Sequence, residues 1–427
     1  MIHYQNLTRS LRHPNYRLFF FGQVTSLIGS WLSLVATSWI VYRIARDTGL
    51  GNAAASLGTL IFLQQIPVTF LAPFAGIWVD RLDRRKVLIC TQTLFMITIF
   101  AFAFLDLSGH ISLPWIYALS LVQGTLVACD LPARQAIVVE LIEDRADLPN
   151  AIALNSSMVP IARLIGPSIA GFLIYHFGEG YCYLLDGFSY LAVIIAYVRM
   201  RIKPHTKPPK RSAKAEFWEV VSYSWKFQPI RASLLIVAIT SGMFVCQSVF
   251  LPILADGVLG GGERALGFLW GASGAGALVG GAYLASRTSI IGIGNIMVLA
   301  LWGLGCGMVG LGLFSSMALC LASLFLMGGG IVLVISSTNM GVQTLVPDGM
   351  RARLMALFNG AFMGLSPFWG MAVGHAGDSL GRGWTLCGFG ALCFVTGLIL
   401  YRKLEHLRTH ARPVLAEKGI ILPLPEI

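Results

Sequence analysis

Charged side chains are scarce in this chain of 427 residues: Asp, Glu, Lys and Arg make up 12% of it, whereas hydrophobic residues make up 56%. A soluble domain carries about a quarter charged residues, so this composition, with a mean hydropathy of +0.73, excludes an ordinary soluble protein. The apolar runs are about twenty residues long and unbroken, whereas the strands of membrane barrels alternate over about ten. The sequence therefore predicts an all-α membrane protein with several spanning helices.

Signatures of catalysis and of nucleotide or metal binding are also missing. The chain contains no H-E-x-x-H or G-x-x-x-x-G-K-[ST] sequence, and its eight histidines do not cluster. The eight cysteines form no C-x-x-C pair and lie mostly inside apolar runs, where we expect them to pack as small hydrophobic side chains. We therefore expect no enzyme, no cofactor and no metal site, and any energy that the protein uses must come from ion or substrate gradients.

The cations are distributed unevenly along the chain. If the N-terminus is cytoplasmic and the spans alternate, the Lys and Arg residues fall in cytoplasmic segments with five exceptions: Arg43, Arg46, Arg264 and Arg382 outside, and Arg163 within a span. This is the positive-inside bias of membrane proteins, and it accounts for the net charge of +11 without a nucleic-acid partner. We therefore predict an even number of spans with both termini in the cytoplasm.

The apolar segments predict twelve spans in two groups of six. The first group lies within residues 1–198 and the second within 233–401; residues 199–232 form a basic cytoplasmic linker, and 402–427 form a cytoplasmic tail that we expect to be disordered. One predicted span is a single helix over about 354–376. Internal similarity ties the groups together, because Gly178-Glu-Gly-Tyr recurs as Gly381-Arg-Gly-Trp, and Arg145-Ala-Asp-Leu as Arg351-Ala-Arg-Leu. Such parallel repeats are typical of two pseudo-symmetric six-helix bundles.

A dense cluster of charges separates the second and third predicted spans: Gly76-Ile-Trp-Val-Asp80-Arg81-Leu-Asp-Arg84-Arg85-Lys86. It resembles the G-x-x-x-D-R-x-x-R-R signature loop of the major facilitator superfamily, with every position filled. One interpretation is topogenic, since cations hold a loop in the cytoplasm. The resemblance also implies a gate that shuts the cytoplasmic side, in which Asp80 meets a helix N-terminus near Asn359 and Gly360, and Arg84 or Arg85 meets Asp130.

The fifth predicted span contains Arg163-Leu-Ile-Gly166-Pro167-Ser-Ile-Ala-Gly171, which resembles the G-P-x-x-G motif of antiporters in this superfamily. Physically it is a seam of small residues with a bend, suited to pressing this span against a helix of the other group; ordinary helix packing is the alternative. A charge inside a bilayer is costly. We therefore expect Arg163 to find Asp130, Asp186 or a substrate anion, and favour a structural ion pair.

Several polar side chains within spans are candidates for a substrate cavity. In this superfamily spans 1, 4, 7 and 10 line the cavity, so the resemblance implies cavity roles for Gln123, Gln247 and Asn339, with Gln23, Trp31 and Gln64 as further candidates. Hydrogen bonding between helices is the alternative for the amides, and packing for the tryptophan. The first span carries no Asp or Glu, which leaves Asp130 and Asp186 as candidates for proton coupling.

Three further segments narrow the resemblance: Leu11–Gln23, Asp130–Gln135 and Asp147–Ser156. They look like the bacterial branch that includes enterobactin exporters and macrolide efflux proteins, also labelled transmembrane secretion effectors. The resemblance implies a monomeric secondary transporter in the bacterial inner membrane that exports a small amphiphilic molecule, a siderophore or a drug, by alternating access and proton antiport. A siderophore uptake carrier, a lysophospholipid or other lipid flippase, and a scaffold without transport activity remain open alternatives.

Overall fold

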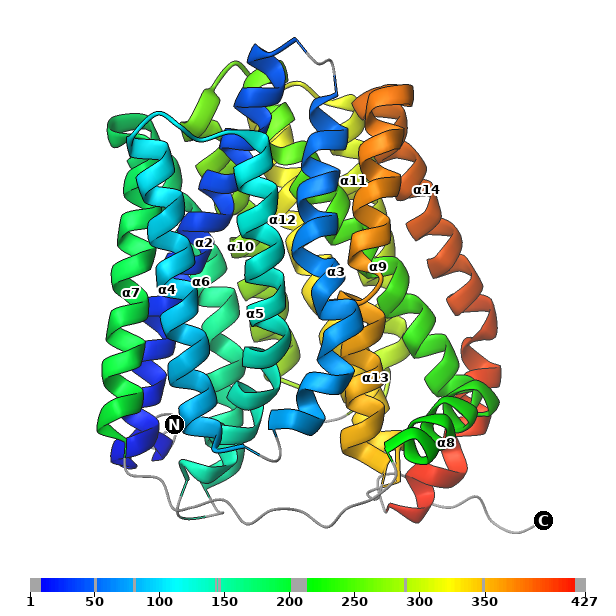
Figure 1. Ribbon diagram of the computed structural model, residues 1–427. Coiled ribbons are helices and arrows are strands. Elements are labelled where there is room, and N and C mark those ends of the chain that lie inside the picture. Colours follow the sequence, from blue (N-terminus) through cyan, green and yellow to red (C-terminus); the bar gives the residue numbers. More distant parts are fainter. Residues whose placement is uncertain are drawn as a thin grey trace, which may run out of the picture.

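The structure is a computed structural model that describes residues 9–49, 52–79, 82–142, 144, 147–200, 213–287, 290–347 and 350–418. The secondary structure of these residues is entirely helical, and the long helices stand roughly side by side (Figure 1). The short helix η1 (Arg9–Arg12), the helix α8 (Ala213–Lys226) and the last turns of α14 (Ser366–Glu417) share one end of the bundle. We call this the lower end, as in Figure 1, and the opposite end the upper end.

The long helices follow one another in two series. The first helix set comprises α2 (Pro14–Asp47), α3 (Ala53–Val79), α4 (Arg84–Leu107), α5 (Leu113–Glu140), α6 (Leu148–Phe177) and α7 (Glu179–Arg199). The second helix set comprises α9 (Gln228–Ile253), which the π-helix η3 (Leu254–Val258) continues, α10 (Gly262–Ala285), α11 (Ile293–Leu313), α12 (Met317–Leu345), α13 (Arg351–Met363) and α14. Between the sets, α3 packs against α14 and α6 packs against α10.

Two glycines in equivalent places of the two sets have nearly the same backbone conformation. Gly178, between α6 and α7, has φ +90° and ψ 172°, and Gly381, inside α14, has φ +79° and ψ 164°. Such positive φ values favour glycine. Gly381 therefore divides α14 into two arms, so that the eleven membrane-length stretches found among the described residues contain twelve spans. The predicted twelve-span fold is confirmed.

Two local predictions for the second set are wrong. The span predicted as one helix over 354–376 is broken between Met363 and Ser366, where Gly364 ends α13 and Pro367 stands in the first turn of α14. The tail predicted to be disordered continues α14 as a helix to Glu417. A stripe of apolar side chains at helical spacing, from Leu404 to Leu415, explains this continuation. Residues 419–427 lie outside the described part.

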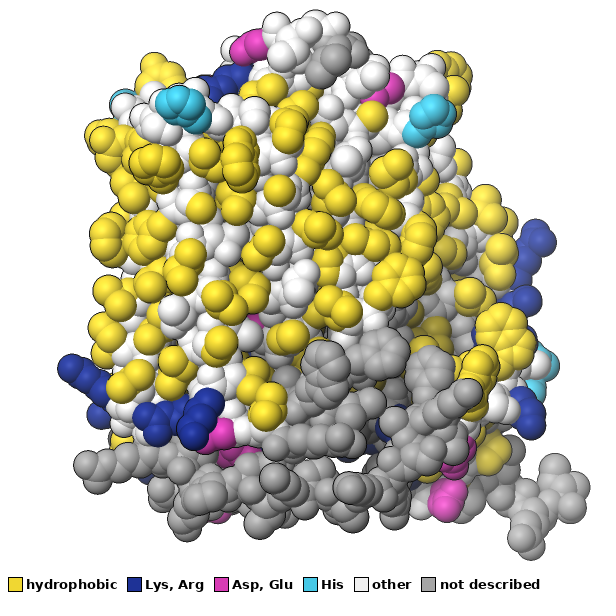
Figure 2. All heavy atoms as spheres, in the orientation of Figure 1, with side chains coloured by type: hydrophobic (Ala, Val, Ile, Leu, Met, Phe, Trp, Pro, Cys, Tyr) yellow, Lys and Arg dark blue, Asp and Glu magenta, His cyan; other side chains and the backbone are white. Residues whose placement is uncertain are grey.

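The surface of the bundle is apolar at mid-height. Figure 2 shows hydrophobic side chains covering the middle of the visible face, with most of the visible Lys and Arg side chains near its lower edge and along its right side. Large apolar side chains such as Phe104, Phe172 and Leu299 are more than half exposed. Such a surface is stable in contact with lipid rather than water, so the chain is a multi-pass membrane protein.

Candidate functional site

Near the upper end, α3 and α14 meet through glycines. A Cβ atom on Gly58 would lie 2.3 Å from the carbonyl oxygen of Gly370, and one on Gly374 would lie 2.8 Å from the carbonyl oxygen of Ala54. These positions have space for a hydrogen atom only, so the two backbones touch directly. The first and second sets are therefore in close contact at this point.

A second seam joins α6 to α10 and contains the antiporter-type motif. A Cβ atom on Gly171 would lie 2.7 Å from the carbonyl oxygen of Glu263, and one on Gly267 would lie 3.1 Å from that of Pro167. Gly166 instead packs within the first set, where its Cβ would lie 2.5 Å from Cβ of Trp31 on α2. The motif thus makes one contact inside its own set, at Gly166, and two across to the other set, at Pro167 and Gly171.

Polar contacts reinforce the upper end, and the sequence analysis did not single them out. The carboxylate of Asp378 on α14 accepts hydrogen bonds from the backbone N–H groups of Ala54 and Ala55, at 3.2 and 2.9 Å, at the N-terminus of α3. Asp256 of η3 forms an ion pair with Arg46 and accepts a 3.0 Å hydrogen bond from the hydroxyl of Tyr42. We call these two contacts the upper latch.

One signal in the sequence points to Asp378. The G-x-x-x-D spacing of Gly76 and Asp80 at the end of the second span recurs as Gly374 and Asp378 near the end of the eleventh. No comparable pattern marks Asp256, because its partners are set by the tertiary fold alone.

The signature loop at the lower end is only partly described. Asp80 and Arg81 lie outside the described residues, and Gly76 lies in the last turn of α3. Arg84 forms an ion pair with Glu140 of α5, and Arg85 donates hydrogen bonds to the carbonyl oxygens of Tyr197 and Val198 on α7. These two arginines therefore contact their own helix set.

The predicted gate stays a prediction, because it forms only when the cytoplasmic side is shut and Asp80 lies outside the described residues, but two of its details differ here. Asn359 and Gly360 lie inside α13, which begins eight residues earlier at Arg351, so they form no helix N-terminus. Asp130, which is fully buried, forms an ion pair with Arg134 one turn further along α5. Arg134 lies one turn away on the same face of α5 and reaches Asp130 directly. Arg84 and Arg85, in the first turn of α4, instead contact the last turns of α5 and α7.

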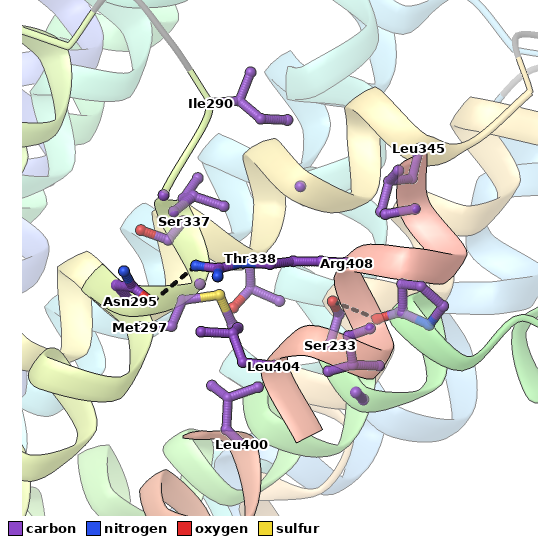
Figure 3. Close-up of a pocket in the computed structure, with 18 of the residues that line it drawn as sticks. Ser233, Ile290, Asn295, Met297, Ser337, Thr338, Leu345, Leu400, Leu404 and Arg408 are labelled. Atoms are coloured by element: carbon purple, nitrogen blue, oxygen red, sulfur yellow. Dashed lines mark hydrogen bonds between the residues drawn. The ribbon is translucent and has the colours of Figure 1, made fainter. Parts of the chain in front are cut away.

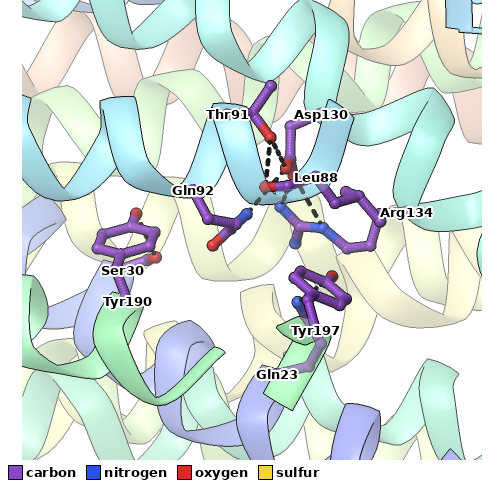
Figure 4. A network of polar contacts seen from close by, with 9 residues as sticks. All are labelled: Gln23, Ser30, Leu88, Thr91, Gln92, Asp130, Arg134, Tyr190 and Tyr197. Atoms are coloured by element: carbon purple, nitrogen blue, oxygen red, sulfur yellow. Dashed lines mark hydrogen bonds and ion pairs between the residues drawn. The ribbon is translucent and has the colours of Figure 1, made fainter. Parts of the chain in front are cut away.

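Asp130 lies at the centre of the polar network drawn in Figure 4. Its Oδ1 accepts hydrogen bonds from Thr91 Oγ1 and Gln92 Nε2 of α4, both at 2.8 Å, while Oδ2 faces the guanidinium of Arg134. Beside it, Gln23 Nε2 donates to the hydroxyl of Tyr197 at 2.9 Å. Gln23 thus joins α2 to α7 and is not among the residues that line a described cavity.

Two cavities lie near the middle of the spans and share Leu34, Gln64 and Gln65. One, of about 230 Å³, is lined by the first set alone, including Gln123 and Asp186. The other, of about 200 Å³, lies between the sets and is lined by aromatic and small polar side chains of α9, α10 and α13 as well as by α2 and α3. Of the predicted cavity amides, Gln64 and Gln123 reach these cavities; Gln65, which does so too, was not predicted.

The other two predicted amides bond to protein groups. Gln247 of α9 donates from Nε2 to Ser273 Oγ of α10 at 2.9 Å. Asn339 accepts a hydrogen bond from Gln343 on the next turn of α12, and Gln343 accepts one from Arg351 at 2.9 Å. For these two residues the interpretation as contacts within and between helices fits the structure better than a cavity role.

Arg163 lies midway along α6 and crosses to the second set. It is 6% exposed, and its Nη2 donates to Ser273 Oγ at 2.8 Å and to Gln247 Oε1 at 3.4 Å. Its guanidinium carbon lies 5.2 to 5.9 Å from the ring centres of three aromatic side chains, those of Phe244, Trp270 and Trp31. We call these three rings and the guanidinium the Arg163 box.

The ion pair predicted for Arg163 is absent: among the described residues, no Asp or Glu lies within ion-pair distance of it. Asp130 is paired with Arg134, and Asp186 bonds to serines. The aromatic faces replace a carboxylate, and desolvated cation–π contacts stabilise such a charge by about 2 kcal/mol. Nε of Arg163 and the indole N–H of Trp270 have no hydrogen-bond partner in the described part of the chain.

Asp186 lies in the upper part of α7 and is 1% exposed. It accepts hydrogen bonds from Ser33 Oγ at 2.5 Å and from Ser189 Oγ at 3.2 Å, and within the described ranges no cation pairs with it. Because it also lines the cavity of the first set, it is a carboxyl group without a counter-charge at the edge of a polar space.

Among the described residues, no three His, Cys, Asp or Glu side chains are grouped so that they could hold a metal ion. The family model described as transmembrane secretion effector matches residues 8–418. The staphyloferrin A transporter of Staphylococcus aureus is 23% identical over 404 residues, which cover 91% of this chain and 97% of that protein. PmrA of Streptococcus pneumoniae, named as a multi-drug resistance efflux pump, is 26% identical over 209 residues, covering 48% of this chain and 50% of that protein.

Solved structures share the fold at low sequence identity. A bacterial homolog of the human lysosomal transporter Spinster, in an inward-facing conformation, aligns with a TM-score of 0.65 and 14% identity over 95% of this chain and 98% of that chain. An auto-inhibited peptide transporter of the POT family aligns with a TM-score of 0.70 and 11% identity over 93% of this chain and 97% of that chain.

Proposed function

Because the chain belongs to the transmembrane secretion effectors, a family of small-molecule transporters with the major facilitator fold and no enzymatic role, we propose that it exports a small amphiphilic compound by alternating access. The observation that carries this proposal is the asymmetric contact between the helix sets. Glycine seams and the upper latch join the sets toward the upper end, whereas Arg85 at the lower end donates its hydrogen bonds to α7 of the first set.

The lower end faces the cytoplasm in this proposal, in a bacterial inner membrane. The Lys and Arg side chains near the lower edge support this orientation, which places both termini inside. The conformation is then closed toward the periplasm, as cargo loading from the cytoplasm requires. The moving bodies are residues 1–198 and 233–401, with 199–232 as their linker, and a single copy of the chain is sufficient.

The export cycle requires the upper contacts to open and a lower latch to form. In our proposal Asp80 and Arg81 of the signature loop supply the lower latch when the sets close over the cytoplasmic side. The Arg163 box would separate at the same time as the upper seam, since Arg163 stands on α6 and two of its aromatic partners on α9 and α10.

The cavity between the sets supports an amphiphilic cargo. Phe244, Trp270 and Phe362 offer apolar contact, and Gln64 and Gln65 offer hydrogen bonds. We propose a siderophore or a drug-like compound, in line with the names of the relatives. A siderophore uptake carrier would differ in direction only, and a lipid flippase would require this cavity to open sideways toward lipid.

Proton antiport would supply the energy, with Asp186 as the group that carries the proton. Asp130 is held by Arg134, so protonating it breaks an ion pair, whereas Asp186 has hydroxyl partners only. A buried carboxyl group without a cation takes up a proton at lower cost.

Flux measurements with the purified chain in liposomes test this proposal. A pH gradient imposed across the membrane should drive a siderophore or a fluorescent cationic dye against its own gradient. Asp186→Asn should abolish this coupled flux while leaving exchange of cargo down its gradient. Asp106→Asn, a change in a carboxyl group at the upper end of α4, is the matched control. Flux that is independent of the pH gradient would refute antiport, and the absence of any flux for all cargos would refute export.

A further inference from the structure

A third cavity lies apart from the proposed cargo path. It has a volume of about 840 Å³ and opens between α9, α11, α12 and α14 at the lower end (Figure 3). It shares no lining residue with the two cavities at mid-height. A space of this size is typical of pockets that hold a ligand.

The equivalent space in the first set is filled. Counted within each set, the helices around the cavity are the first, third, fourth and sixth, and their counterparts are α2, α4, α5 and α7. There a cluster of fully buried side chains occupies the lower end, including the rings of Tyr16, Phe19 and Tyr197. The repeat pairs Tyr197 with Leu400, whose smaller side chain leaves room. The hollow is therefore a property of this chain's second set, not of the fold.

The walls of the cavity are largely apolar. Along α14, Leu400, Leu404, Ala411 and Leu415 line it at helical spacing, a stretch of about 22 Å at 1.5 Å per residue. Ile236 and Met297 form its deeper part. From Leu400 to Arg408 this wall is about 12 Å long, so it covers the part of a fatty-acyl chain nearest the headgroup. Ser337 Oγ, on a fully buried lining residue, has no hydrogen-bond partner among the described residues.

The mouth of the cavity is basic. Arg408 and Arg412 of α14 line it, and Arg408 donates to Asn295 Oδ1 at 3.0 Å (Figure 3). Arg287 lies beside it, with its Nη2 2.7 Å from the carbonyl oxygen of Ile291, another lining residue. Among the described residues of the lining, Glu405 is the one acidic residue; its side chain is 85% exposed and pairs with Arg408. The charge at the mouth therefore remains positive.

We propose that this cavity binds an anionic glycerophospholipid of the adjacent leaflet, with one acyl chain along α14 and the phosphate at Arg408 and Arg412. The cavity lies where the spans α9 and α11 begin, at the end of their apolar stretches, where lipid headgroups stand. Basic pockets between transmembrane helices at such boundaries bind anionic headgroups, and each buried methylene adds about 0.8 kcal/mol. A bound lipid fills the hollow that the first set fills with aromatic rings.

Native mass spectrometry of the purified full chain tests this site. Equal amounts of dioleoyl phosphatidylglycerol and dioleoyl phosphatidylcholine are added, and the retained lipid is measured. We expect preferential retention of phosphatidylglycerol. Arg408→Gln combined with Arg412→Gln should weaken this retention about thirtyfold, which corresponds to about 1 kcal/mol per arginine.

A filling variant keeps the test independent of charge. Gly341 lines the cavity, and a Cβ atom there would meet nothing within 4 Å, so Gly341→Leu should fill the groove without strain and abolish retention. Gly388→Leu, at an exposed site of α14 with equal space, is the matched control and should retain the lipid. Equal retention of both lipids, unchanged retention in Gly341→Leu, or binding of oleate in place of phosphatidylglycerol would overturn the proposal. None of these results depends on transport, so they leave the proposed export untouched.

Discussion

The carboxylate of Asp378 lies 3.2 Å from the backbone nitrogen of Ala54, so that a helix of the second set caps the N-terminus of a helix of the first. A carboxylate at a helix N-terminus satisfies free N–H groups and complements the helix dipole. The superfamily resemblance implies the same kind of contact for Asp80 at the lower end, with the roles of the two sets exchanged. We infer that, at each end, closure places a carboxylate of one set at the N-terminus of a helix of the other set.

Removing the upper carboxylate should loosen the upper end. We expect Asp378→Ala to cost the upper-closed state about 0.5–2 kcal/mol, the usual cost of a lost N-cap, and so to raise the upper-open population about 2- to 30-fold. Spin labels at positions 48 and 260, exposed at the upper ends of α2 and η3, should report longer distances by pulsed electron paramagnetic resonance. Asp106→Ala, which removes a carboxylate from the upper end of α4 within the first set, is the control. An unchanged distance distribution would show that Asp378 is no latch.

The Arg163 box should matter more for transport than for stability. Arg163→Met keeps the side-chain length and removes a buried charge without a carboxylate partner, so relief from desolvation offsets the lost cation–π contacts. We expect the melting temperature to stay constant or rise while coupled flux falls at least tenfold. Arg231→Met, which removes an exposed arginine stacked over Trp225, should change neither quantity. A large loss of stability with normal flux per folded molecule would contradict this expectation.

The seam between α6 and α10 predicts opposite effects for two similar substitutions. Gly171→Ala places a methyl group 2.7 Å from the backbone of α10, and such overpacking typically costs about 1–3 kcal/mol. Gly281→Ala on α10 meets only a side-chain carbon at 3.8 Å and should gain helix propensity of up to about 1 kcal/mol. Thermal unfolding of the two variants should therefore shift in opposite directions. Equal shifts would mean that the seam is loosely packed.

The fold follows from features that the sequence displays directly. Apolar runs and turn glycines determine the spans, and the repeated Gly-x-Gly pattern at Gly178 and Gly381 produces the same positive-φ turn in both sets. The break before Ser366 and the helical tail escaped prediction. The break depends on Gly364 and Pro367, and the helical tail depends on its amphipathic stripe. The mean apolar character of a segment reveals neither feature.

The site was harder to predict because its partners are chosen in three dimensions. Asp130 could be recognised as a buried carboxylate, but its choice of Arg134 over Arg84 depends on helix phase. Arg163 could be recognised as a charge that needs a partner. The sequence does not reveal that three aromatic rings from three helices surround it, because Trp31, Phe244 and Trp270 form no pattern along the chain.

The N-terminal contact of Asp147 gives a prediction about pH. Asp147 precedes α6 and pairs with Arg9 of η1 and with His13 Nε2 at 3.1 Å. Burial pushes the pKa of Asp147 upward, but the hydrogen bonds with His13 and Arg9 outweigh it and hold the pKa of this carboxyl below its ordinary value. A depressed carboxyl pKa means that the folded state binds its proton more weakly than the unfolded chain. The contact therefore stabilises the fold above the ordinary Asp pKa of about 3.9, and this contribution is lost as the pH falls through the lowered value.

Asp147→Asn should melt at a lower temperature than the wild type at pH 7, and circular dichroism melts of both should converge below pH of about 3.9. A difference between them that grows on acidification would give the shift the opposite sign and refute the ion-paired contact.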